Sequence, residues 1–350
     1  MYVAKNSRGV LVNLLQIEKS QPLIKETYYC PACRQKLILK AGNVKQRHFA
    51  HCAKKTCESF SEGETAEHLA GKALLFNWDQ EAQLEVSLAS IGQRADVLLP
   101  QLALEFQCSP LSTAKLEKRV AGYKKMNLQQ WWLTGERLKE GVLRQGSSHF
   151  CLFNQTFGVH FWHLNTSKKS IELYTHLLTM SKQKSFKRKI FNFQEQPLSQ
   201  IFGDRNSVPS IVCSTKKDWQ QQKLSVQKKL YYCLPEILQI QQALYRRGSH
   251  LLQLPEILFA PSIATPFFGD WLYFLRFHFF QKSLSCSAID LHEFSFQLTQ
   301  RFLQTYQLQQ KFPLVEPAAI SAAFFTESCR LFQAFQQKKT SFKVFSADSL

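Results

Sequence analysis

The chain has 350 residues, of which 45% are hydrophobic and 20% are charged. That length is enough for two or three domains with hydrophobic cores, and the composition excludes a long disordered tract. No apolar leader opens the chain, and no stretch reaches the ~20 apolar residues of a membrane span. We therefore expect neither a signal peptide nor a membrane span.

The net charge of +18 indicates a polyanionic partner, for which nucleic acid is the usual case. The charge is unevenly distributed. Residues 1–60 carry 11 Lys and Arg against 3 acids, residues 61–146 carry 10 against 11, and residues 147–350 carry 23 against 12. This split suits a middle segment whose acids bind metal, with DNA-binding charge on both flanks.

Residues 1–60 are predicted to form a zinc-binding β domain. Residues 2–4 and 10–12 flank a polar turn and predict an opening hairpin. Cys30 and Cys33, with two residues between them, form a knuckle that supplies two tetrahedral zinc ligands, and His48 and His51 can supply the other two. A rival set replaces the histidines with two later cysteines, Cys52 and Cys57. Zinc here would be structural, because this small segment has few large apolar residues.

Residues 61–147 are predicted to hold a second domain that opens with a helix. Ser61 is expected to begin this helix, with Glu64 three residues on. Glu64, His68 and Lys72 recur every four residues and so share one helical face, with Glu67 beside them. A solvated face and an active-site face both give this pattern. A strand is expected over residues 84–88.

Residues 94–107 predict a hairpin of two apolar strands joined at Pro100 and Gln101. If the hairpin is symmetric, Asp96 lies opposite Glu105, and Arg94 lies opposite Gln107 on the same face. Facing carboxylates repel each other, so we expect a divalent cation between them, Mg²⁺ by preference.

An amphipathic helix over residues 112–126 offers Lys118 and Arg119 to phosphates, and residues 130–133 form a further strand. The predicted core is therefore αβββαβ. Residues 148–350 are predicted to be a basic, mostly helical C-terminal domain. Within it, the run Lys187-Arg188-Lys189 suits a nucleic-acid backbone. The overall fold class is α+β and multidomain.

The acids of the middle segment resemble a known enzyme superfamily. Asp96 followed by Glu105-x-Gln107 is similar to the PD-(D/E)xK nucleases, in the variant with Gln where Lys is usual. The flanking residues and the Cys-Pro-Ala-Cys and His-Phe-Ala-His elements resemble the competence protein CoiA family. The motifs that carry this resemblance are Ser61-Glu62-Gly63-Glu64-Thr65-Ala66-Glu67-His68 with Lys72, Arg94-Ala95-Asp96-Val97 and Glu105-Phe106-Gln107-Cys108-Ser109.

The resemblance implies a restriction-endonuclease-like core and a cytoplasmic protein. It also implies action on incoming DNA, expected to be single-stranded, at or before recombination in natural transformation, with a recombinase or other competence proteins as possible partners. In the implied reaction, Asp96 and Glu105 hold Mg²⁺ or Mn²⁺, with Glu64 or Glu67 as a third carboxylate. Gln107 can orient water but carries no charge. Lys72, about one helical turn beyond His68, is the candidate for the missing cation.

A second hypothesis belongs to a different class. The chain can be a DNA-binding or recombinase-assisting protein in which the nuclease fold is only a scaffold. Gln107 in place of lysine supports this hypothesis, whereas the presence of both acids, Asp96 and Glu105, argues against it.

Overall fold

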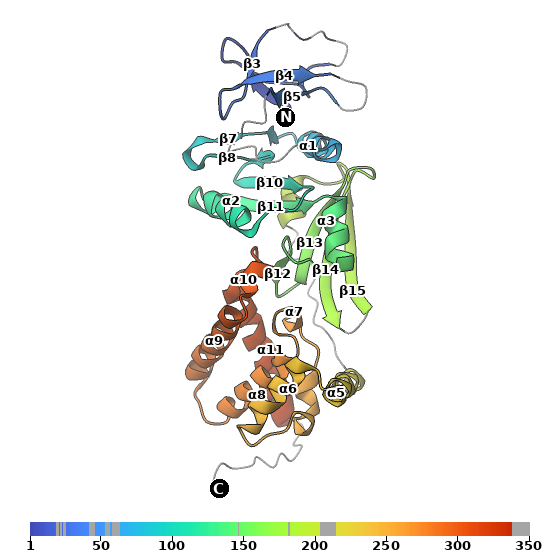
Figure 1. The fold of residues 1–350 in the computed structure, drawn as a ribbon, viewed down its shortest axis with the longest axis vertical. Helices are drawn as coiled ribbons and strands as arrows, with labels where there is room; N and C mark the ends of the chain where they lie inside the picture. The colour runs from blue at the N-terminus through green and yellow to red at the C-terminus, as the bar shows by residue number, and fades with distance from the viewer. Residues whose placement is uncertain are drawn as a thin grey trace. The chain divides into compact units, whose positions relative to one another are not determined.

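The computed structural model describes residues 1–350 except 19–20, 22, 24–25, 42–45, 53–56, 58–63, 146, 181–182, 204–214 and 338–350. It divides the chain into two compact units. Unit 1 comprises residues 1–150, 161–174 and 188–207, and unit 2 comprises residues 151–160, 175–187 and 208–350. The predicted mixture of strands with a helical C-terminal part is confirmed (Figure 1).

Unit 1 opens with an antiparallel five-stranded sheet in the order β2-β1-β3-β4-β5. The predicted opening hairpin is confirmed, since β1 pairs with β2 from Val3–Asn13 to Lys5–Leu11. The strands are β1 (Val3–Lys5), β2 (Leu11–Asn13), β3 (Tyr28–Tyr29), β4 (Lys36–Lys40) and β5 (His48–His51).

A second, eight-stranded sheet carries the predicted central hairpin. Its order is β15-β14-β13-β11-β10-β9-β6, with β12 paired to β13. The strands are β6 (Gln83–Leu84), β9 (Val97–Leu99), β10 (Leu102–Gln107), β11 (Gln129–Thr134), β12 (Leu152–Asn154), β13 (Gly158–Asn165), β14 (Ser170–Met180) and β15 (Gln183–Asn192). A small ribbon of β7 (Ser87–Leu88) and β8 (Gln93–Arg94) lies off this sheet.

The hairpin of β9 and β10 has the predicted register. Leu99 pairs with Leu102 and Val97 pairs with Leu104, so the turn is Pro100-Gln101. Gln101 has a φ of 59°, as the third residue of a type II turn requires, and proline is common at the residue before it in such turns. Continued by one residue, the register places Asp96 opposite Glu105.

Two helices cover opposite faces of β10. On one face, helix α1 (Ala66–Trp78) approaches so closely that a Cβ on Gly71 would lie 2.1 Å from the ring of Phe106. On the other face, Tyr123 of helix α2 (Thr113–Lys125) packs with Ala103 and donates to Glu105. Successive side chains of a strand alternate between its faces, so Phe106 and Glu105 point to different helices.

The remaining helical segments are short in unit 1 and dominate unit 2. Unit 1 adds η1 (Ala89–Ile91), α3 (Glu136–Glu140), η2 (Gly141–Gln145) and α4 (Leu198–Gly203). Unit 2 contains α5 (Lys216–Tyr231), α6 (Pro235–Tyr245), η4 (Leu251–Gln253), η5 (Glu256–Phe259), α7 (Thr265–Phe268), α8 (Trp271–Ser283), α9 (Ala288–Thr305), α10 (Leu308–Lys311) and α11 (Pro317–Gln337). Its core is rich in phenylalanine, for example Phe279 and Phe324.

Three local predictions require correction. Helix α1 begins at Ala66 because the hydroxyl of Thr65 accepts the N–H of His68; Ser61 lies outside the described residues. Glu64 therefore precedes the helix and does not lie on its face. Arg94 does not lie opposite Gln107, since it belongs to β8 and pairs with Ser87. The strand predicted over residues 84–88 is interrupted at Glu85, whose φ is 52°.

Candidate functional site

Asp96 lies just before β9 and is held by two donors. Its Oδ2 accepts a hydrogen bond from the backbone N–H of Phe106 at 3.1 Å, and the Nε2 of His68 on α1 lies 3.1 Å from the same oxygen. Burial raises the pKa of Asp96, but His68, Lys72 and Arg119 outweigh burial and hold that pKa far below its usual range. Asp96 is therefore ionised at neutral pH.

Glu105 lies in the middle of β10 and is 1% exposed. Its Oε1 accepts from the guanidinium of Arg119 and from the hydroxyl of Tyr123, both on α2. Burial raises the pKa of Glu105 to about 7, and the nearby charge of Asp96 adds to this rise, whereas Arg119 opposes it. The two carboxylates thus titrate far apart.

Each carboxylate of the pair has a side-chain partner, so the two acids do not by themselves demand a metal ion. His68 faces Asp96, and Arg119 pairs with Glu105. One atom lacks compensation: Glu105 Oε2 is buried and has no hydrogen-bond partner among the described residues. A buried carboxylate oxygen without a partner, within electrostatic reach of the ionised Asp96, fits Mg²⁺. This ion commonly binds through one or two carboxylates together with water and phosphate.

Lys72 and Glu64 meet in a different place from the one their spacing suggested. Lys72 is fully buried, and its ammonium pairs with Glu64 and with Glu85. Burial lowers the pKa of Lys72, but Glu85 and Glu64 outweigh burial and raise that pKa above its usual value. Glu64 also pairs with the amino group of Met1, and Arg94 lies 3.7 Å from it.

Glu85 fastens this charge cluster to the first sheet. Its Oε2 accepts the backbone N–H groups of Tyr2 at 2.8 Å and Val3 at 2.9 Å. The cluster of Lys72, Glu64 and Glu85 therefore joins the N-terminal sheet to α1. It offers no free ammonium to a phosphate.

Glu67 and Gln107 flank the Asp96–Glu105 pair and have partners of their own. Glu67 Oε1 accepts the backbone N–H of Glu136 at 2.8 Å. The Nε2 of Gln107 donates to the carbonyl of Ser109 at 2.8 Å. Neither Glu64 nor Glu67 joins Asp96 and Glu105 in a three-ligand cluster among the residues that the structure describes.

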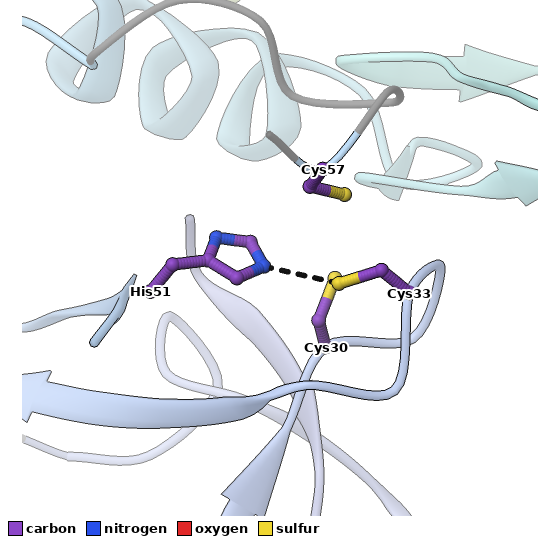
Figure 2. A group of neighbouring side chains, drawn as sticks. All are labelled: Cys30, Cys33, His51 and Cys57. Atoms are coloured by element: carbon purple, nitrogen blue, oxygen red, sulfur yellow. Dashed lines mark hydrogen bonds between the residues drawn. The ribbon is translucent and has the colours of Figure 1, made fainter. Parts of the chain in front are cut away.

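A separate cluster in the N-terminal region has the composition of a metal site. The ligand atoms of Cys30, Cys33, His51 and Cys57 all lie within 4.8 Å of one another, and Figure 2 shows the four side chains converging. Cys33 Sγ is 3.3 Å from His51 Nε2. Zinc–ligand bonds of about 2.0–2.3 Å require such spacing, so the donor set fits a tetrahedral ion.

The cluster combines the two predicted ligand sets: it contains His51 but not His48, and Cys57 but not Cys52. His48 and His51 lie three residues apart on β5, so their side chains leave opposite faces of the strand. His48 instead has its Nδ1 2.8 Å from the carbonyl of Gln46. Cys52 is exposed, with its Sγ 3.5 Å from the carbonyl of Lys36. Cys57, by contrast, lies close to Cys30 and Cys33.

The predicted DNA contacts are not equally available. Lys118, Lys187 and Lys189 are exposed, and Lys189 lies over the ring of Phe191 at 4.7 Å. Arg188 is 3.6 Å from Glu172. Arg119 is held at Glu105, with 27% of its side chain exposed, so it belongs to the candidate active site.

Two residues of the site escaped sequence reasoning. The sequence pattern indicates that Tyr123 is an inward-facing core residue of α2. It indicates that Glu85 is an outward-facing polar residue of an alternating strand. The sequence around residue 85 predicts neither the left-handed backbone of Glu85 nor its hydrogen bonds to Tyr2 and Val3.

Two family models match this chain. "Competence protein CoiA, nuclease-like domain" matches residues 64–206, and "Competence protein CoiA, N-terminal domain" matches residues 13–60. The chain is similar to "Competence protein CoiA" of Bacillus subtilis, with 35% identity over 166 residues. That alignment covers 45% of this chain and 42% of the relative, so less than half of the relative is spanned. No solved structure matches, and none of the described helices has the length and apolarity to cross a membrane. The chain belongs to the competence protein CoiA family.

Proposed function

We propose that the chain is a metal-dependent deoxyribonuclease of natural transformation, acting in the cytoplasm on incoming, single-stranded DNA at or before recombination. The nuclease-like family match and the net charge of +18 support this role. The observation that carries the chemistry is the Asp96–Glu105 pair, with a buried carboxylate oxygen that lacks a partner. A recombinase or another competence protein is the expected partner.

Different residues of the chain have separate roles at the scissile phosphate. Bound Mg²⁺ or Mn²⁺ would neutralise phosphate charge and acidify a water. His68 orients Asp96, and Tyr123 orients Glu105. Arg119, rather than Lys72, supplies the cation that Gln107 lacks, because Lys72 is fully buried between two glutamates whereas 27% of the Arg119 side chain is exposed.

The proposal is tested by incubating the purified chain with single- and double-stranded DNA and Mg²⁺ or Mn²⁺. We expect cleavage, and we expect Asp96→Ala and Glu105→Ala each to lower its rate by about a hundredfold or more. Glu117→Ala is the matched control, because Glu117 is an exposed acid on α2. Cleavage at the original rate by either variant would refute the active-site assignment.

One observation favours the non-catalytic alternative. Gln107 brings no charge, and its amide already donates to Ser109. A DNA-binding or recombinase-assisting protein on a nuclease scaffold would bind DNA, yet show no cleavage with any divalent cation. Because it needs no metal at Asp96 and Glu105, Glu105→Gln would leave its DNA affinity unchanged with and without Mg²⁺.

We also propose that the N-terminal cluster binds one structural zinc ion through Cys30, Cys33, His51 and Cys57. Elemental analysis of the purified chain should find one zinc per chain, and Cys57→Ser should lower this content strongly. Cys52→Ser is the matched control and should keep its zinc, since Cys52 is exposed and lies outside the cluster. Zinc lost with His48→Ala but kept with Cys57→Ser would restore the pair of histidines as ligands.

A further inference from the structure

The turn between α5 and α6 in unit 2 displays two tyrosines to solvent. Tyr231 is 81% exposed and Tyr232 is 71% exposed. Their ring centroids are 5.3 Å apart, and the rings stand nearly perpendicular. Aromatic rings bury large apolar areas wherever they can, so two adjacent exposed rings indicate a surface for a ligand.

The backbone holds this turn in one conformation. Leu234 N–H donates to the carbonyl of Lys229 at 3.1 Å, and Cys233 N–H donates to that of Leu230 at 3.0 Å. This pair of bonds is the Schellman ending of a helix, and its left-handed position is filled by Cys233 with a φ of 50°, where glycine is usual. The tyrosines therefore project from a defined turn.

Helix α6 continues the apolar surface away from the turn. Leu234, Leu238 and Tyr245 are 44%, 42% and 60% exposed. Their spacing of four and seven residues places them along one stripe of the helix. The eleven residues of α6 span about 16 Å. The exposed stripe is therefore long enough to contact more than one aromatic ring of a ligand.

The charge around the stripe is strongly positive. Residues 215–250 contain seven Lys and Arg against two acids, Asp218 and Glu236. Two of the seven pair with acids outside this segment, Lys216 with Glu256 and Lys229 with Asp270. Asp218 is bound to Thr215 at the start of α5, and Glu236 lies two residues from Leu234, turned away from the stripe towards Gly269. Lys228 is exposed and forms no ion pair within the described part of the chain.

We propose that Tyr231, Tyr232 and Tyr245 form a stacking platform for the bases of single-stranded nucleic acid, with Lys228 and Arg246 contacting its phosphates. Exposed aromatic rings interleaved with basic residues are the means by which proteins bind single strands without sequence preference. Positive charge alone would bind duplex and single-stranded nucleic acid equally well, whereas stacking on the rings requires unpaired bases. This platform needs no cleavage and is independent of the nuclease proposal.

The test is fluorescence anisotropy of the full chain with a labelled oligo-dT, in buffer without added divalent cation. The double variant Tyr231→Ala/Tyr232→Ala should bind the oligonucleotide at least about tenfold more weakly. Its affinity for a duplex of the same length should change less than twofold. Tyr231→Phe/Tyr232→Phe keeps the rings and should bind as the original chain does. Ile289→Ala, at a position 83% exposed on α9, is the control for loss of exposed apolar surface.

Three outcomes would overturn the platform. Oligo-dT affinity unchanged in the double alanine variant would exclude stacking, and an equal loss on duplex would indicate general charge or a folding defect. A lower mass of the alanine variant in light scattering, with unchanged affinity, would assign the surface to self-association. If neither the original chain nor any variant cleaves DNA, but the double alanine variant loses oligo-dT binding, the nuclease proposal fails while the stacking proposal is supported.

Discussion

Lys72→Ala is expected to lower the free energy of unfolding of unit 1 by about 3–5 kcal/mol. Lys72 is fully buried, and its ammonium pairs with both Glu64 and Glu85. Removing it leaves two carboxylates without their main cation, one of them entirely buried. Urea unfolding followed by tryptophan fluorescence measures the loss, because four of the six tryptophans, Trp78, Trp131, Trp132 and Trp162, lie in unit 1.

Two further variants separate a structural Lys72 from a catalytic one. Lys72→Met/Glu85→Gln removes one charge of each sign at similar volume, so it should be less destabilising than Lys72→Met alone. Lys115→Ala, an exposed lysine on α2, should change stability by no more than about 0.5 kcal/mol. A Lys72→Ala protein with full stability but without cleavage would instead make Lys72 the missing cation of the reaction.

Without added divalent cation, the stability of unit 1 is expected to fall by about 2–3 kcal/mol between pH 5 and pH 8 through Glu105 alone. Burial raises the pKa of Glu105 from 4.5 to about 7. Between these two values the folded state holds a proton that the unfolded chain has released. Its stabilising effect is therefore complete below about pH 4.5 and is lost as the pH rises through about 7.

The variant Glu105→Gln isolates the contribution of Glu105 to the pH dependence of stability, measured by the same urea unfolding repeated at several pH values. The glutamine cannot ionise, so the variant should match the original chain near pH 5 and exceed its stability at pH 8. Glu117→Gln, at an exposed position of α2, should keep the original slope. Parallel pH profiles for the original chain and Glu105→Gln would show that Glu105 has an ordinary pKa.

The sequence was sufficient for the hairpin of β9 and β10 because its determinants are local. Alternating apolar residues and one turn with Pro100 fix which residues face each other, and the register from Leu99–Leu102 to Val97–Leu104 followed directly. The same alternation placed Asp96 near Glu105. The family resemblance is also confirmed.

The surroundings of these acids were not predictable, because they depend on contacts between distant segments. Helical periodicity put Glu64, His68 and Lys72 on one face, yet Glu64 precedes α1, and Lys72 turns to Glu85 thirteen residues away. Spacing alone left the second pair of zinc ligands open, whereas strand β5 sends His48 and His51 to opposite faces. The endonuclease-like core, the domain limits and the roles of the individual residues stay predictions.

Glu85 has a consequence for how this protein can be divided. Its carboxylate accepts the N–H groups of Tyr2 and Val3, so a single residue of the nuclease-like segment binds two backbone donors at the start of the first sheet. A fragment that starts at residue 64, where that family match begins, would lack both donors and would open the enclosure around Lys72 to water. Both segments belong to one compact unit, so we expect a stable fragment to need residues 1–60 together with the nuclease-like segment.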